Sequence, residues 1–531
     1  MGGKGWIAGL AGITALLLAC GAGDAGSEEE ASSEVNASKG FPRGFVFGTA
    51  VAGFQVDMGC PHLAPDLCED RASDWYQWIT TPRILDNPIL FMSKDPPASG
   101  PGFYETFEED LQRARGEGAG ELGNDALRLS IEWSRLFPRP TWGVSGHEEL
   151  RRIASADGLA FYHRLLRGMK ARGLSPFVTV SHYSLPLWVH DGNLCNQSLD
   201  ACIAQQKAGW ADPDRGRIVG ELAKYARFLA TEFGDEVDHW ATLNEPFSAV
   251  VLPGYVISTP MRSNPPGLSG PWMRLDGAKT ATTAMIEAHA RMYDAIKEAD
   301  TKDADGDGKP AEVGIVYAFS EIVPASASEG DQRAAEHAEY LFHDMFMDGV
   351  VEGRIDEDWT AGPGKAPVRR DIAGRVDFIG VNYYFRFEAK RALIPLSFLN
   401  PFLDFDLLAK FDPQPRGIHA TIMRIADRYK KPIYVTETGT TQEDPARGGA
   451  WVVKTLAEVR RAIRGGADVR GYFAWSLMDN YEWNHGMGMR FGLYAVDPAT
   501  KARTIREAGE AYRAIVRARM KSDDWFLKAF R

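Results

Sequence analysis

The sequence of 531 residues predicts a single domain folded as a closed (β/α)8 barrel, also called a TIM barrel. Eight short apolar runs, rich in β-branched and aromatic residues, have the length and composition of buried strands. Stretches with helical spacing of apolar residues separate these runs, and a regular alternation of strands and helices indicates a parallel sheet. A doubly wound open sheet is the alternative, but no glycine-rich phosphate loop follows the first apolar run.

The expected elements follow one another in order along the chain. Each strand is a run of four or five mostly apolar residues, and each helix has apolar residues three or four positions apart. The expected strands cover residues 45–48, 126–130, 177–180, 240–243, 313–317, 377–381, 433–436 and 471–475. The expected helices cover residues 107–115, 159–172, 217–233, 278–299, 333–351, 418–429, 452–463 and 505–517.

The composition restricts the partners of the protein. The formal net charge is −12, and no cluster of Lys and Arg interleaved with aromatic residues occurs. Binding to a phosphate backbone therefore lacks an electrostatic basis, and we expect no nucleic acid partner. The 14 Trp, 17 Tyr and 27 Phe include many flat apolar faces, which suit sugar rings, although most of them will fill the core.

The first 40 residues are expected to be a targeting segment and a tether. Residues 1–19 carry one charge, Lys4, and an apolar stretch too short to span a bilayer, which ends in "LLAC" at Cys20. This segment resembles a bacterial lipoprotein signal, which implies cleavage before Cys20, a lipid anchor on its thiol and a location on the periplasmic or cell-surface side of the envelope. An ordinary secretory signal is the alternative. Residues 20–40 then form a flexible acidic tether, and residues 41–531 form the barrel domain.

Four further cysteines fit an exported protein. Cys60 lies close to Cys68, and Cys195 lies close to Cys202, in stretches rich in Pro, Asn and Asp that indicate loops. Local pairing is the simplest of the three possible connectivities, and four free thiols are the alternative.

Two glutamates each end an expected strand. Glu245 lies in "HWATLNEP" and Glu437 lies in "KPIYVTETG". A lone glutamate at such a place is usually a helix cap or a surface charge. Here the carboxyl ends of all barrel strands converge on one face, so the two carboxyl groups would meet there. Two carboxyl groups acting on one bond are typical of a glycosidase.

Other polar and aromatic residues also fall at the carboxyl ends of the expected strands. Taken singly they have ordinary explanations: an ion pair, a capped loop histidine, or tryptophans that fill the core. Their common placement indicates one shared pocket. These candidate binding residues are Gln55, Arg128, His182, Asn244, Asn382, Tyr384, Trp475, Glu482 and Trp483.

Several motifs together resemble glycoside hydrolase family 1. They include "FPRGFVFGTAVAGFQVD", "LRLSIEWSRLFP", "TLNEP", "DFIGVNYY", "YVTETG" and "WSLMDNYEWNHGMGMRFG", and they extend from Phe41 to about Arg517. The segments "SDWYQWI", "GPGFYETF" and "DNYEW" are most similar to the archaeal β-glycosidase branch. The resemblance implies a retaining β-glycosidase whose substrates are small oligosaccharides or aryl and alkyl β-glycosides without phosphate. A transglycosylase with the same intermediate and a carbohydrate-binding pseudoenzyme are the alternatives.

The resemblance also implies a role for each catalytic residue. Glu245 would be the acid/base and Glu437 the nucleophile, with the carboxyl groups about 5 Å apart. Repulsion between the pair and desolvation should raise the pKa of Glu245, while Arg128 and Tyr384 should stabilise the charged form of Glu437. Asn244 would hold the 2-hydroxyl group of the sugar.

The remaining candidates would bind the sugar. Gln55, His182 and Glu482 offer hydrogen bonds to ring hydroxyls, and Trp475 and Trp483 offer apolar faces to its C–H groups. A charged Glu482 beside the 6-position would repel a phosphate. We expect no cofactor and no metal ion in this site.

Three positions depart from the family pattern without removing a catalytic group. Thr438 replaces the usual Asn after the nucleophile, Asp57 stands where Glu is common, and Tyr183 replaces the usual Trp after His182. A phenol near the 3-hydroxyl could shift the choice among gluco, galacto and fuco sugars.

A separate motif, D-x-D-x-D-G, contains Asp303, Asp305, Asp307 and Gly308. It matches the first half of a calcium-binding loop, but the twelfth position is Gly314, which supplies no carboxylate. We expect an acidic surface turn here, and a calcium site is the alternative.

Overall fold

The computed structural model describes residues 40–519, apart from residues 89, 91, 257–264, 266–274 and 407–408. The expected signal segment, Cys20, residues 20–39 of the expected tether and the last twelve residues of the expected domain lie outside the described residues.

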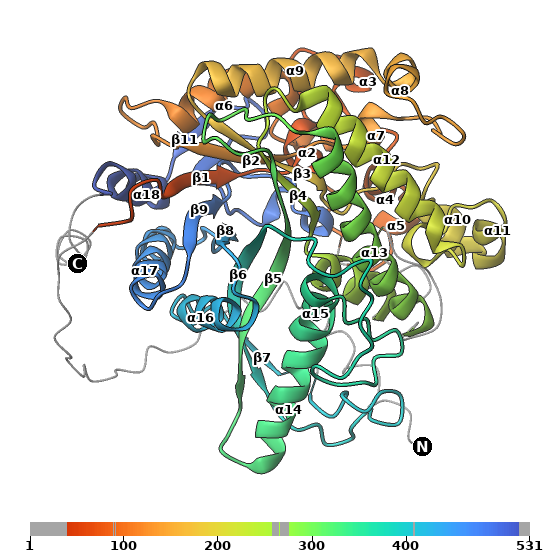
Figure 1. Cartoon of the computed structure of the whole chain (residues 1–531). Coiled ribbons are helices and arrows are strands. Elements are labelled where there is room, and N and C mark those ends of the chain that lie inside the picture. Colours follow the sequence, from red (N-terminus) through yellow and green to blue (C-terminus); the bar gives the residue numbers. More distant parts are fainter. Residues whose placement is uncertain are drawn as a thin grey trace.

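Eight parallel strands form a closed barrel, as the sequence predicts (Figure 1). The first strand, β1, pairs with β2 on one side and with β9 on the other, and a pairing of β5 with β6 completes the ring. The barrel strands are β1 Val46–Ala50, β2 Ala126–Ser130, β3 Ser175–Ser181, β4 His239–Asn244, β5 Glu312–Pro324, β6 Phe378–Ala389, β8 Ile433–Thr438 and β9 Val469–Trp475.

Helices surround the barrel and bury one apolar face each against it (Figure 1). In α9, for example, Ser155 caps the first turn by accepting a hydrogen bond from the N–H of Gly158, and Leu159, Tyr162 and Leu166 lie on the buried face. The main helices are α6 Phe103–Arg115, α9 Ala156–Ala171, α12 Arg215–Phe233, α13 Leu275–Ala299, α14 Glu329–Glu339, α15 Met345–Glu352, α16 Gly417–Tyr429, α17 Pro445–Arg464 and α18 Glu507–Arg517.

Shorter elements occupy the connections. The short α-helices are α2 Gly53–Asp57, α3 Pro65–Cys68, α4 Asp74–Thr80, α5 Pro82–Leu85, α7 Trp133–Leu136, α8 His147–Ile153, α10 Gly192–Gln197 and α11 Leu199–Ala204. The 3-10 helices are η2 Pro97–Ser99, η3 Gly209–Ala211 and η6 Trp483–Gly488, and the π-helices are η4 Pro246–Val256 and η5 Tyr340–Asp344. The strands outside the ring are β7 Lys410–Asp412, β10 Tyr494–Val496 and β11 Arg503–Ile505.

The interior of the barrel is filled by four aromatic rings and several small residues. Phe177 makes edge-to-face contacts with Phe378, Tyr434 and Phe473 at centroid distances of 5.3 to 5.6 Å. A Cβ atom on Gly48 would lie 2.4 Å from the ring of Phe473, so only glycine fits there. The barrel is therefore a packed core, and the site chemistry is confined to its ends.

Two elements differ from the sequence prediction. Strands β5 and β6 continue beyond the ring as a ribbon as far as the pairing of Pro324 with Ala389, and the short strand β7 pairs with the other edge of β6 there. Polar residues alternate with apolar ones along this extension, so the sequence contains no continuous apolar run that would predict it. The single helix expected over residues 333–351 is α14 and α15 joined by the π-helix η5, where His343 contacts Glu339.

The two disulfides are local, as the simplest pairing predicts. Cys60 bonds to Cys68, and Cys195 bonds to Cys202. The first closes the segment between α2 and α4, and the second joins α10 to α11. Both therefore hold connections in shape and add little to global stability.

The two ends of the described chain meet at the amino-terminal end of the barrel. The N–H of Phe41 donates to the carbonyl oxygen of Arg519 at 3.0 Å. The guanidinium group of Arg519 pairs with Asp125, just before β2, at 2.9 Å. Phe41 packs against Phe45 and Phe47, so both ends are fixed to the foot of β1.

Candidate active site

The structure places every candidate site residue either within a barrel strand, toward its carboxyl end, or in the segment that follows the strand. Because the eight strands are parallel, these ends lie on one face of the barrel. The residues lie on α2 (Gln55), β2 (Arg128), the end of β3 (His182), the end of β4 (Asn244 and Glu245), β6 (Asn382 and Tyr384), β8 (Glu437), the end of β9 (Trp475) and the connection after it (Glu482 and Trp483).

Both carboxylate oxygens of Glu437 accept a short hydrogen bond. Arg128 Nη1 donates to Oε1 at 2.5 Å, and the hydroxyl of Tyr384 donates to Oε2 at 2.6 Å. Glu437 is buried, with 3% of its surface exposed. The guanidinium group and the hydroxyl together fix the orientation of this carboxylate.

Arg128 connects four strands of the barrel. Besides Glu437, it donates to Asn244 Oδ1 at 2.7 Å and to Thr179 Oγ1 at 3.2 Å, and it approaches the carbonyl oxygen of Thr436 at 3.4 Å. Sequence reasoning did not identify Thr179 or Thr436, because threonine in a buried strand has no distinguishing pattern. The guanidinium group is thereby held by β3, β4 and β8.

Glu245 lies in a different environment. Asn382 Nδ2 donates to its Oε1 at 2.7 Å, and the hydroxyl of Tyr183 donates to its Oε2 at 2.9 Å. Burial, followed by the charge of Glu437, raises the pKa of Glu245 to about 7. The sequence predicts a raised pKa for Glu245, and the structure agrees, with burial as the main cause. At neutral pH a large share of Glu245 is therefore protonated and can act as an acid.

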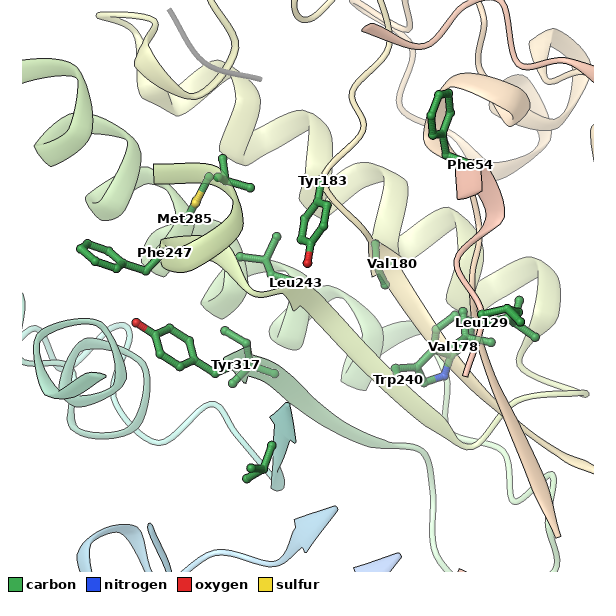
Figure 2. Close-up of a cluster of buried hydrophobic side chains, with 14 of the residues drawn as sticks. Phe54, Leu129, Val178, Val180, Tyr183, Trp240, Leu243, Phe247, Met285 and Tyr317 are labelled. Atoms are coloured by element: carbon green, nitrogen blue, oxygen red, sulfur yellow. The ribbon is translucent and has the colours of Figure 1, made fainter. Parts of the chain in front are cut away.

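Tyr183 connects Glu245 to Asn244. Its hydroxyl donates to Glu245 and accepts a hydrogen bond from Asn244 Nδ2 at 2.8 Å. Figure 2 shows the hydroxyl turned toward the end of β4, beside Leu243. The sequence suggested a sugar contact for Tyr183, and its contact with Glu245 was missed. No sequence signal gives this contact, because it depends on the left-handed backbone of Tyr183, with φ 72°, and of Glu245, with φ 43°.

Aromatic rings form one side of the site. Trp483 is partly exposed and stacks on Phe54 at 5.8 Å, and it contacts Trp75 at 4.6 Å and Tyr183 at 4.9 Å. The ring of His182 lies nearly parallel to that of Trp475, with centroids 6.0 Å apart. These flat faces are suited to the C–H groups of a sugar ring.

The polar candidates on the same side are buried. Gln55 donates to Asn480 Oδ1 at 3.3 Å, and its own Oε1 has no hydrogen-bond partner among the described residues. Burial, with the charge of Arg128, holds the pKa of His182 well below its usual value, so its ring is neutral. Asn480 was not identified from the sequence, because an Asn in the "MDNYEW" segment resembles an ordinary turn residue.

The sequence suggested a charged Glu482 beside the sugar, and the structure indicates a largely uncharged one. Trp475 Nε1 donates to Glu482 Oε1 at 3.2 Å, and burial is the main cause that raises the pKa of Glu482 to about 8. The group is therefore largely uncharged at neutral pH. Repulsion of a phosphate by Glu482 is accordingly weaker than the sequence suggested.

A (β/α)8 barrel that holds one buried and one partly buried carboxyl group in unlike environments, beside aromatic faces and neutral hydrogen-bonding groups, has the arrangement of a glycoside hydrolase. The family model "Glycosyl hydrolase family 1" matches residues 37–521, and the chain belongs to this family. As a member, the protein is a retaining β-glycosidase.

Similar proteins include archaeal enzymes. The chain is 34% identical to a β-galactosidase of Saccharolobus solfataricus over 519 residues, which cover 90% of this chain and 94% of the relative. It is 32% identical to a β-galactosidase of Pyrococcus woesei over 511 residues, which cover 88% of this chain and 95% of the relative. The crystal structure of the β-glycosidase from Thermosphaera aggregans superimposes with a TM-score of 0.75 at 28% identity, covering 92% of this chain and 99% of that chain.

Proposed function

We propose that the protein hydrolyses terminal, non-reducing, unphosphorylated β-D-glycosides of the gluco, galacto or fuco type, with Glu437 as nucleophile and Glu245 as acid/base. The unlike environments of these two carboxyl groups support this assignment best. Glu437 accepts hydrogen bonds from the guanidinium group of Arg128 and the hydroxyl of Tyr384, which hold its carboxylate in place. Glu245 has a pKa raised to about 7, which favours a proton.

The reaction has two steps. First, Glu437 attacks the anomeric carbon, the bond to the leaving oxygen breaks, and Glu245 gives that oxygen its proton. Second, Glu245 takes a proton from water, the water oxygen attacks the anomeric carbon, and the ester bond to Glu437 breaks. Two inversions give retention of configuration.

Neighbouring groups would hold the sugar during these steps. Asn244 is fixed by Arg128, Tyr183 and Asn382, and we assign its amide to the 2-hydroxyl group. The unpartnered Oε1 of Gln55 would accept a bond from another ring hydroxyl. A buried acceptor without a donor is unfavourable, so a sugar hydroxyl in this position adds to binding.

The substrate class can be tested with nitrophenyl β-glucoside, β-galactoside and β-fucoside, and with nitrophenyl β-galactoside 6-phosphate. We expect release of nitrophenol from at least one of the first three, with the β-anomer of the sugar appearing first by NMR, and slower release from the phosphate ester. Absence of turnover with every glycoside would indicate a binding protein. Formation of a new glycoside from an added sugar acceptor, at the expense of free sugar, would indicate a transglycosylase.

Tyr183→Phe is expected to shift the alkaline limb of the kcat/KM profile to higher pH. The hydrogen bond from Tyr183 lowers the pKa of Glu245, so its loss raises that pKa and keeps the acid protonated to higher pH. One hydrogen bond corresponds to about 1 pH unit or less. A pH–rate profile measures the shift.

Tyr293→Phe is the matched control for this prediction. Its hydroxyl donates to Asp377 Oδ1 at 2.9 Å, just before β6, so it lies at the opposite end of the barrel. We expect its profile to match the wild type. An unchanged alkaline limb in Tyr183→Phe would show that Tyr183 does not tune Glu245.

We also propose that a lipid on Cys20 attaches the protein to the bacterial envelope. The signal-like residues 1–19 and the cysteine that follows them support this location. None of the described helices combines the length and apolar character that crossing a bilayer requires. Cys20→Ser is expected to move the enzyme from the membrane fraction to the soluble fraction, with unchanged activity. Membrane association that survives this substitution would contradict the anchor.

A further inference from the structure

We propose that Asp238, Asp303 and Asp305 form a binding site for a divalent cation of the calcium type at the amino-terminal end of the barrel. The D-x-D-x-D-G motif lacks its own last carboxylate. In the structure, a carboxylate from another part of the chain lies beside this motif. Asp238, the residue before β4, is next to the loop that joins α13 to β5. One carboxylate oxygen from each of the three aspartates lies within 4.8 Å of the others.

The side chain of Asp238 indicates that a ligand binds here, because one of its carboxylate oxygens has no hydrogen-bond partner among the described residues. The side chain is buried, with 7% of its surface exposed. Its Oδ2 accepts a hydrogen bond from the N–H of Asp305, whereas Oδ1 has no hydrogen-bond partner among the described residues. A buried carboxylate oxygen without a donor is costly, and a cation would compensate it.

The three aspartates also have no cationic partner among the described residues. Among the ion pairs of the described residues, none includes Asp238, Asp303 or Asp305, whereas Asp307 pairs with Lys309 at 3.2 Å. A bound cation would therefore relieve repulsion among the three carboxylates.

The loop is shaped to hold its carboxylates in place. Asp303 accepts hydrogen bonds from the N–H groups of Gly306 at 2.7 Å and Gly308 at 2.9 Å, and both glycines have positive φ. Each carboxylate oxygen keeps a second lone pair for a metal. Calcium accepts six to eight oxygen ligands at about 2.3–2.6 Å, so oxygens that share one ion lie at most about 5 Å apart. The exposed side of Asp303 and Asp305 leaves room for water ligands.

The site would stabilise the fold without taking part in hydrolysis. It would join the start of β4 to the connection before β5, at the opposite end of the barrel from Glu245 and Glu437. The inference is therefore independent of the proposed function.

Thermal unfolding and calorimetry test the proposal. Protein freed of metal with a chelator and then freed of the chelator is expected to gain a few degrees in Tm with CaCl2, because a ligand that binds only the folded state stabilises it. MgCl2 at equal ionic strength should give a smaller gain. Titration of the wild type with CaCl2 should show one site with a Kd of about 10⁻⁴–10⁻³ M, the range of extracellular calcium modules.

Asp303→Asn and Asp305→Asn should each remove most of the calcium-dependent rise in Tm. Asp307→Asn is the matched control in the same loop and should keep it, because the carboxylate of Asp307 lies outside the triad. The titration of the wild type does not depend on how well any variant folds. An absent rise in the wild type, an equal rise with MgCl2, or an equal rise in Asp303→Asn and Asp307→Asn would overturn the proposal.

Discussion

Glu437→Gly is expected to abolish hydrolysis, and azide is expected to restore cleavage. Without the carboxylate, no covalent intermediate forms, and we expect a loss of at least about a thousandfold in kcat. Azide enters the space that the side chain leaves and attacks the anomeric carbon from the same face. The product is the α-glycosyl azide, which NMR distinguishes from the β-anomer, and release of nitrophenolate measures the rate.

Glu443→Gly is the control for this experiment, because Glu443 is exposed and lies six residues further along the chain. It is expected to keep wild-type activity and to show no response to azide. A β-glycosyl azide from Glu437→Gly, or activity close to that of the wild type, would assign the nucleophile to another residue.

Glu245→Ala is expected to slow the cleavage of poor leaving groups far more than that of good ones. An alkyl leaving oxygen needs a proton from Glu245, and general acid catalysis contributes about 10²–10⁴-fold. A dinitrophenolate leaves without protonation, so its release should change little in the first step. Azide should give the β-glycosyl azide here, because it replaces the water that Glu245 activates.

The pH profile gives a second measurement on the same variant. An acid must be protonated to act, so the kcat/KM of the wild type should fall as the pH rises through about 7, the raised pKa of Glu245. This limb should be absent in Glu245→Ala. Glu321→Ala, in the ribbon part of β5, removes another carboxyl group whose pKa is raised by burial and should leave the limb in place. Equal losses for good and poor leaving groups would contradict the acid role.

The order of the barrel strands could be predicted because each strand of the ring contains a short, buried run in which apolar residues predominate. The continuation of β5 and β6 beyond the ring could not be predicted, because residues such as Glu321 and Arg386 alternate with apolar residues there. The π-helix Tyr340–Asp344 was also missed, because the apolar pattern continues through it.

The membership of the site could be predicted because strand ends in a barrel converge. The hydrogen bonds between the site residues could not be predicted, because they depend on side-chain directions that a sequence motif does not specify. Tyr183 reaches Glu245 through two residues with positive φ, and Thr179 holds Arg128 from a neighbouring strand. Asp238 is more than sixty positions from the loop it approaches, so the D-x-D-x-D-G motif gave no sign of it.

The hydrogen bond between Phe41 and Arg519 has a practical consequence for handling the enzyme. Both ends of the folded domain leave from the foot of the barrel, and the catalytic carboxyl groups lie at the opposite opening. A purification tag, a fusion partner or a solid support joined directly at Phe41 or Arg519 is therefore attached behind the reaction centre. Immobilised enzyme should keep its substrate entrance directed toward the bulk solution.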